Sequence, residues 1–107
     1  MINVSIFYPN TEGSRFDLDY YLTQHIPMTI AKLTPALKHV SVEHGLGGVI
    51  PGAAPEFVAI CHLYFDSVEA FQTAFGPHAA VLQGDIPNYT DVRPIIQISE
   101  VKISQLS

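Results

Sequence analysis

The sequence predicts an α+β protein in which four strands and two helices follow one another in the order βαββαβ. Two observations support this prediction. Four segments alternate in the two-residue period of a strand, and two intervening segments repeat apolar side chains at helical spacing. A chain of 107 residues suits one domain, which we expect to span residues 1–107.

The first strand is expected at residues 2–8, and Tyr8-Pro9-Asn10 ends it. Residues 11–14 have the composition of a turn. Asp17 is then a suitable N-cap for the first helix, because its carboxylate can accept a backbone hydrogen bond, and Pro35 closes this helix. The apolar side of the helix is expected to hold Leu18, Tyr21, Leu22, His25, Ile30 and Leu33.

The second half of the chain repeats the pattern of strand and helix. Residues 57–65 alternate apolar side chains on both sides, which predicts a central strand with both faces shielded from water. Asp66-Ser67 offers N-cap chemistry to the helix that follows. The elements expected here are a strand at 37–45, a loop rich in Gly and Pro at 45–55, the strand at 57–65, a helix with an apolar stripe from Val68 to Leu82 that Gly76-Pro77 kinks or restarts, a loop at 83–94, and a strand at 95–103.

This order is the split βαβ arrangement of a ferredoxin-like fold, an antiparallel sheet with both helices on one face. The plainly apolar rows of the strands are expected to face the helices. The opposite rows are half polar and half aromatic, which suits the lining of a small-molecule cavity. Two such sheets facing each other would form a closed dimeric α+β barrel. The opposite rows comprise Asn3, Ser5, Phe7, His39, Ser41, Glu43, Ile60, His62, Tyr64, Gln97 and Ser99.

Composition and charge exclude several classes of function. The net charge is −5 and no run of Lys or Arg occurs, which argues against nucleic acid and anionic membranes as partners. No segment has the length of a membrane span, and the first residues lack the pattern of a signal peptide, so we expect a cytoplasmic protein. Apolar residues make up 48% and charged residues 14%, which predicts a homodimer or a higher homo-oligomer. The single cysteine, Cys61, is expected in the core.

His25 is the leading candidate for chemistry, because Pro27 follows it closely within the first helix. Proline removes a backbone donor and disfavours helical geometry before it, so the turn that holds His25 is expected to be kinked. An imidazole there suits a general acid or base near neutral pH. Tyr21, one turn earlier, could donate a hydrogen bond to a developing oxyanion. The alternatives are that His25 caps its own helix and Tyr21 is a core residue, whereas Tyr20 is expected at the surface or an interface.

A second group of candidate residues lies on the sheet. His62 and Tyr64 are two residues apart, which puts both side chains on one strand face. Phe7 belongs to the same face of the sheet in the expected arrangement. These three side chains are therefore expected to contact a ligand in the cavity.

The stretch Asp85-Ile86-Pro87-Asn88-Tyr89-Thr90-Asp91 carries apolar side chains between two aspartates, which is unusual for a solvated loop. We expect a lid or an interface arm. Asp85 would polarise His25 if this stretch folds back on the first helix. Asn88 and Tyr89 are candidate ligand contacts, with backbone capping in a turn as the alternative for Asn88.

No metal or cofactor is expected. His39 and Glu43 share a strand face, but four residues of strand separate them by about 13 Å, too far for one ion. His62 or His25 could supply an axial ligand to haem, although no further feature supports haem. Gly45-Leu46-Gly47-Gly48 matches neither the dinucleotide nor the phosphate-loop spacing.

Four motifs along nearly the whole chain occur together in one known family. They are Tyr8-Pro9, Phe16-Asp17-Leu18-Asp19-Tyr20-Tyr21 with His25 four residues on, Phe65-Asp66-Ser67, and the stretch from Asp85 to Asp91. By these motifs the chain resembles the EthD-domain family, named for ethyl tert-butyl ether degradation, within the dimeric α+β barrel superfamily. The resemblance implies the ferredoxin-like fold, a dimer or higher oligomer, and a small hydrophobic or aromatic ligand.

Related barrels include cofactor-independent monooxygenases, polyketide cyclases, muconolactone isomerases and haem-using enzymes, so the resemblance alone does not specify a reaction. Our leading hypothesis is an enzyme, with oxidoreductase or monooxygenase-type chemistry or acid–base chemistry of a cyclase or isomerase type, in which His25 acts on the bound molecule. The alternative is a non-catalytic ligand-binding or accessory protein of a degradation or biosynthesis pathway.

Overall fold

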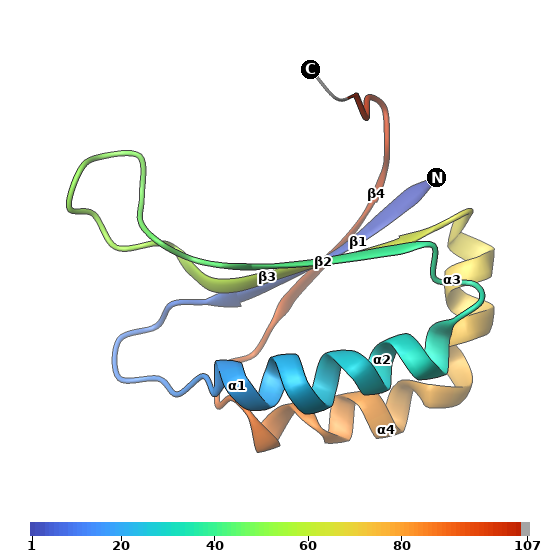
Figure 1. Cartoon of the computed structure of the whole chain (residues 1–107), viewed down its shortest axis with the longest axis horizontal. Helices are drawn as coiled ribbons and strands as arrows, with labels where there is room; N and C mark the ends of the chain where they lie inside the picture. Colours follow the sequence, from blue (N-terminus) through green and yellow to red (C-terminus); the bar gives the residue numbers. More distant parts are fainter. Residues whose placement is uncertain (106–107) are drawn as a thin grey trace.

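The computed structural model describes residues 1–105 and contains a four-stranded antiparallel sheet with the strand order β2-β3-β1-β4. The helices all pack on one face of this sheet (Figure 1). The predicted α+β class and the βαββαβ order of a ferredoxin-like fold are therefore confirmed. The strands are β1 (Ile2–Pro9), β2 (His39–His44), β3 (Phe57–Phe65) and β4 (Ile95–Glu100).

The strand register places the apolar rows toward the helices, as the alternation predicts. Val4 lies opposite both Leu63 and Ile98, and Ser5 lies opposite His62. One face of the sheet therefore carries the apolar rows, and the other face carries the rows of mixed polar and aromatic residues. Along β3 the residues that face the helices are buried, whereas His62 and its neighbours on the other side are only half-buried. The expectation that both faces are shielded is therefore wrong for the single chain, because all the helices cover the same face.

The first helix contains a π-helical turn. Its segments are α1 (Leu18–Tyr20), η1 (Tyr21–His25) and α2 (Ile26–Leu33). Asp17 caps it as predicted, since the carboxylate accepts a hydrogen bond from the Tyr20 backbone N–H. In the π turn the N–H of Ile26 donates to the carbonyl of Tyr21. The wider turn accommodates Pro27, which cannot donate to the carbonyl four residues earlier and would clash with it.

The extra residue in the π turn rotates the buried face of the helix. Tyr21, His25 and Thr29, at intervals of four residues, all point inward and are buried. Leu22 and Ile30 were expected on the same side, and this expectation is wrong: they are 45% and 37% exposed. The prediction assumed a regular repeat of 3.6 residues, which a π turn interrupts.

The second helical region is divided as predicted at Gly76-Pro77. Ser67 caps α3 (Val68–Phe75) by accepting a hydrogen bond from the Ala70 N–H. A 3-10 turn, η2 (Gly76–His78), then leads into α4 (Ala79–Gly84). A further 3-10 turn, η3 (Ile86–Asn88), lies within the segment expected to be a loop. No helix within residues 1–105 is long and apolar enough to cross a membrane.

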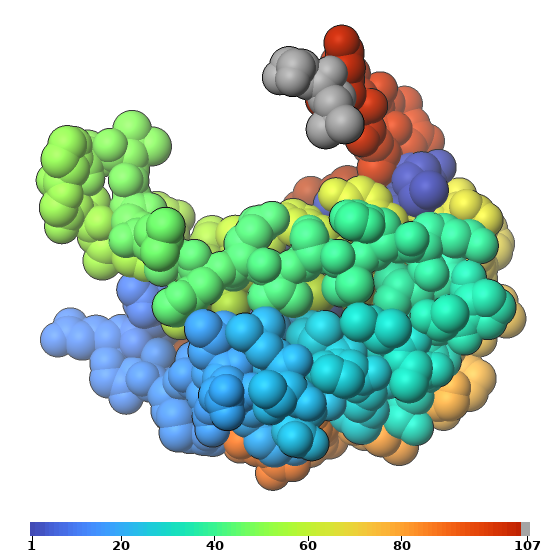
Figure 2. Space-filling model, in the orientation of Figure 1, coloured from blue at the N-terminus to red at the C-terminus, as the bar shows by residue number. Residues whose placement is uncertain are grey.

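The face of the sheet opposite the helices, here called the open face, is hollowed. Residues 45–56 and the segment after β4 rise on either side of it, as the space-filling view shows (Figure 2). The loop exposes Leu46, Val49 and Ile50, and the segment after β4 exposes Ile103. The open face is thus concave and flanked by apolar side chains.

Candidate active site

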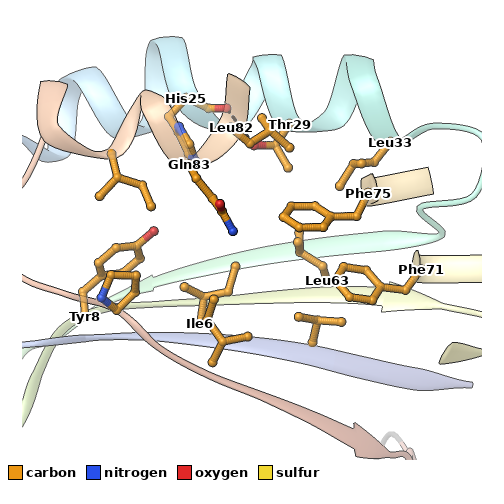
Figure 3. A pocket seen from close by; sticks show the side chains of 14 residues that line it. Ile6, Tyr8, His25, Thr29, Leu33, Leu63, Phe71, Phe75, Leu82 and Gln83 are labelled. Atoms are coloured by element: carbon orange, nitrogen blue, oxygen red, sulfur yellow. Dashed lines mark hydrogen bonds between the residues drawn. The ribbon is translucent and has the colours of Figure 1, made fainter. Parts of the chain in front are cut away.

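A cavity of about 260 Å³ lies between the sheet and the helices (Figure 3). Aliphatic and aromatic side chains form most of its wall: Val4, Ile6, Leu33, Leu63, Phe71 and Phe75. Pro94 and Ile96, just before and within the edge strand β4, and Gln83 and Ile86, near the end of the second helical region, also line the cavity. The cavity is therefore a mainly apolar chamber of the kind that takes a small molecule.

Four polar residues take part in the lining: Tyr8, His25, Thr29 and Gln83. His25 and Thr29 point down from the first helix, Gln83 extends inward from α4, and Tyr8 rises from β1 (Figure 3). The Thr29 hydroxyl donates to the carbonyl of His25 at 3.0 Å and so stabilises the irregular turn. The other three are positioned to meet a polar group of a ligand, while Phe71 and Phe75 lie farther along the cavity.

His25 is held by a carboxylate from sixty residues later in the chain. Its Nδ1 lies 2.9 Å from Oδ2 of Asp85, and the two side chains are only 10% and 14% exposed. The other oxygen of Asp85 accepts hydrogen bonds from the Tyr20 hydroxyl at 2.7 Å and from Nδ2 of Asn88 at 2.9 Å. Because a carboxylate accepts, Nδ1 is the protonated nitrogen, and Nε2 is left as the acceptor for a ligand.

These contacts favour the ionised form of Asp85. Desolvation by burial works against ionisation, but hydrogen bonds from Asn88, His25 and Tyr20 outweigh it and hold the pKa of Asp85 below its usual value. The hydrogen bond to Asp85 raises the pKa of the Tyr20 hydroxyl, because the hydroxyl donates its hydrogen to a carboxylate. Asp85 is therefore an anion that orients the imidazole.

A cluster of aromatic rings surrounds this pair. The ring of Tyr21 stacks on the imidazole of His25 with the ring centroids 5.5 Å apart, and the ring centroid of Tyr89 lies 4.7 Å from that of His25. The hydroxyls of Tyr8 and Tyr89 are 2.7 Å apart. Desolvation by burial raises the pKa of Tyr21, Tyr89 and Tyr8, so all three stay neutral phenols that can donate hydrogen bonds. Burial also raises the pKa of the Cys61 thiol to about 11.

The segment that carries Asp85 is fixed to the start of the first helix. The Asp17 N–H donates to the carbonyl of Tyr89 at 2.7 Å, and the Thr90 hydroxyl donates to the carbonyl of Arg15 at 2.7 Å. The guanidinium of Arg15 donates to the carbonyl of Pro87. Tyr89 and Thr90 are both buried. These contacts fold the segment back and bring Asp85 to His25.

The structure divides the candidate residues predicted from the sequence into two groups. His25, Tyr21, Asp85, Asn88 and Tyr89 come together around the imidazole. In this group only His25 contributes to the cavity wall, while Asn88 supports Asp85 and Tyr89 packs behind.

The other group consists of Phe7, His62 and Tyr64, which lie on the open face. They do not line the cavity between sheet and helices, because alternate residues of a strand point to opposite faces. There Nδ1 of His62 is within 3.0 Å of the Asn3 amide and 3.1 Å of the Ser5 hydroxyl. Within residues 1–105 no cluster of His, Cys, Asp and Glu is arranged to hold a metal ion.

Sequence reasoning missed Tyr8, Gln83 and the supporting role of Tyr20. Tyr8 continues the buried row of β1, and that continuation was a signal that its hydroxyl lies inside the fold. Tyr20 was expected at the surface or an interface, but it is half-buried and holds Asp85. Gln83 carried no signal, since a glutamine near a helix end is usually solvated.

A family model described as the EthD domain matches residues 13–93. The chain belongs to the EthD family. The matched range contains His25, Asp85 and both other donors to Asp85, whereas Tyr8 lies before it. No curated protein matches the chain.

Solved structures of EthD proteins are similar to this chain over almost its full length. A crystal structure of an EthD-like protein from Ralstonia eutropha JMP134 is 48% identical, with a TM-score of 0.93, covering 97% of this chain and 94% of that one. An ethyl tert-butyl ether degradation (EthD) family protein from Bacillus halodurans C-125 is 20% identical, with a TM-score of 0.65 and coverages of 94% and 98%. HapK from Hahella chejuensis shares the fold, with 12% identity, a TM-score of 0.55 and 98% of each chain covered.

Proposed function

We propose that this EthD protein binds a small, mainly apolar molecule in the cavity between sheet and helices, and that His25 transfers a proton to or from it. The observation that carries the proposal is the hydrogen-bonded pair of His25 and Asp85, in which the imidazole lines a mainly apolar cavity. An imidazole oriented by a buried carboxylate is a recurring arrangement for general acid–base catalysis.

The roles of the residues follow from the hydrogen bonds. Nε2 of His25 accepts a proton from an O–H or an activated C–H group of the ligand, and Asp85 stabilises the imidazolium that forms. Tyr8, a neutral phenol, can donate to an oxygen on which negative charge develops. Removal of this proton would be the first step of an isomerisation or a cyclisation. It would also be the first step of a reaction in which the electron-rich ligand attacks molecular oxygen. The oxidoreductase chemistry that the resemblance implies is thus a part of this proposal.

His25→Gln tests the catalytic role, with His44→Gln as the matched control. His44 is an exposed histidine at the end of β2, so its loss removes an imidazole far from the cavity. Against a panel of small phenols and ketones, we expect His25→Gln to lower turnover at least a hundredfold with ligand affinity changed far less. Binding by the wild type without turnover of any compound would favour the alternative, a ligand-binding or accessory protein.

We further propose that a second copy of the chain covers the open face. The face is concave, Ile95 on it is exposed, and exposed apolar side chains flank it on both sides. Sedimentation equilibrium at micromolar concentration tests this proposal, and a monomer would contradict it.

A further inference from the structure

The shape, charge and hydrogen-bond polarity of the cavity restrict its ligand. Resting on the function proposed above, we propose that the cavity selects a neutral, single-ring molecule that carries a hydroxyl group, such as a substituted phenol, with this hydroxyl donating to Nε2 of His25. Three independent features of the cavity lead to this class of ligand.

The first feature is size. An apolar cavity of about 150 Å³ is known to hold benzene, which has six non-hydrogen atoms. At the same packing, the 260 Å³ of this cavity hold roughly ten non-hydrogen atoms. One ring with a few substituents fills this space, and three fused rings exceed it. Ring faces of Phe71 and Phe75 lie at the end of the cavity away from Tyr8, where an aromatic or aliphatic ring packs well.

The second feature is charge. The residues that line the cavity include neither Lys nor Arg. Asp85 places an anion directly behind His25, and the chain as a whole carries a net charge of −5. Arg93 lines a separate depression on the surface next to the cavity, and Asp91 lines the same depression. A carboxylate or phosphate inside the cavity would lose its hydration and gain no fixed cation, so a neutral ligand is favoured.

The third feature is the direction of the hydrogen bonds. The carboxylate of Asp85 accepts a hydrogen bond from the Nδ1–H of His25, so Nε2 presents a lone pair, and the ligand must supply the hydrogen. The Thr29 hydroxyl donates to the carbonyl of His25. The Tyr8 hydroxyl can donate to the ligand oxygen when the hydroxyl of Tyr89, 2.7 Å away, donates to it. The amide of Gln83 extends into the cavity and can donate to the ligand oxygen. A hydroxyl both donates and accepts, whereas an ether or ketone oxygen would face the lone pair of Nε2.

Matched ring compounds test this inference. The probes are 4-ethylphenol, its isostere 4-ethyltoluene, the acceptor-only 4-ethylanisole, the anion 4-ethylbenzoate and a three-ring phenol. Isothermal titration calorimetry gives the dissociation constants. Changes in the NMR chemical shifts of His25 show whether a compound binds in the cavity. We expect 4-ethylphenol to bind at least about tenfold more tightly than each of the others, since losing one buried hydrogen bond has about that effect.

Asp85→Asn supplies a second, independent readout. An amide that donates to Nδ1 moves the histidine proton to Nε2, so the variant is expected to lose the preference for 4-ethylphenol over 4-ethylanisole or to reverse it. Equal binding of 4-ethylphenol and 4-ethylanisole by the wild type would overturn the inference and leave the proposed binding function intact. Failure of all the ring compounds to bind in the cavity would overturn the proposed function as well.

Discussion

Asp85→Asn changes the charge behind His25 without changing the shape of the side chain. In the wild type, Oδ1 of Asp85 accepts from both Tyr20 and Asn88. An amide is therefore expected to keep its oxygen on that side and to turn its NH₂ group toward His25. Because an NH₂ group cannot accept a hydrogen bond from Nδ1–H, His25 takes the other tautomer, and the nitrogen that faces the ligand becomes a donor.

The effect on stability follows from the three hydrogen bonds that Asp85 accepts. A bond to a charged group contributes roughly 1.5–3 kcal/mol and a neutral one about 1 kcal/mol, and partial exposure reduces the difference. We expect a net loss of about 1–2 kcal/mol. The unfolding entropy is about 2.1 cal/mol/K per residue, so in a chain of 107 residues this loss lowers the Tm by about 4–9 °C.

The pH dependence has a definite sign. Although desolvation raises it, the hydrogen bonds from Asn88, His25 and Tyr20 leave the pKa of Asp85 below the ordinary value of about 3.9. The stability from this group is present above that unfolded-state value and is lost as the pH falls through the lower folded-state value. The difference in Tm between wild type and Asp85→Asn should therefore shrink below about pH 4.

Two assays check these expectations. Nitrogen-15 NMR of the His25 ring distinguishes the protonated from the unprotonated nitrogen in each protein, and thermal unfolding by circular dichroism gives the Tm from pH 3 to 8. The same pattern of ring-nitrogen shifts for His25 in both proteins would contradict the change of tautomer. A difference in Tm that does not change at acid pH would contradict the role of the ionised Asp85 in stability.

Three further predictions concern other parts of the molecule. Tyr20→Phe removes one donor to Asp85, so NMR titration should find a higher pKa for that carboxyl than in the wild type, and an unchanged value would contradict this. Ile95→Lys, on the open face, should shift sedimentation toward the monomer, whereas Ile30→Lys on the outer side of α2 should not. Cys61 is buried with a pKa raised to about 11, so iodoacetamide should modify it slowly at pH 8 and rapidly after denaturation, as mass spectrometry would show.

The sheet was predictable because its strands carry a strict alternation. The pattern in β1 and β3 predicted which side chains face the helices, and the register of Val4 with Leu63 agrees with it. The interior of the first helix was not predictable in the same way. A proline indicates that the helix is perturbed, but not whether it kinks or forms a π turn, and this difference decides whether Leu22 and Ile30 are buried.

The site was predictable only in part, for a reason of distance along the chain. His25 and Tyr21 are local to one helix, so the sequence pattern brings them together. Asp85 reaches His25 only through contacts such as the hydrogen bond from the Asp17 N–H to Tyr89, and no periodicity encodes a contact across so many residues. The cavity itself lies on the helix side, where the sequence indicated a packed core, because apolar patterning does not show whether a core is filled.

The two residues of the pair occupy similar positions in their own elements. Each begins a three-residue run with the same second and third residues, His25-Ile26-Pro27 and Asp85-Ile86-Pro87. At the first run the helix widens into a π turn, and at the second α4 gives way to a 3-10 turn. In both places a proline two residues later in the chain interrupts the regular helical hydrogen bonding. The proline also restricts the unfolded chain, which lowers the conformational entropy lost on folding. Proline at these positions therefore both redirects the side chains and helps to stabilise the irregular turns, so that the imidazole and the carboxylate are held 2.9 Å apart by the fold itself.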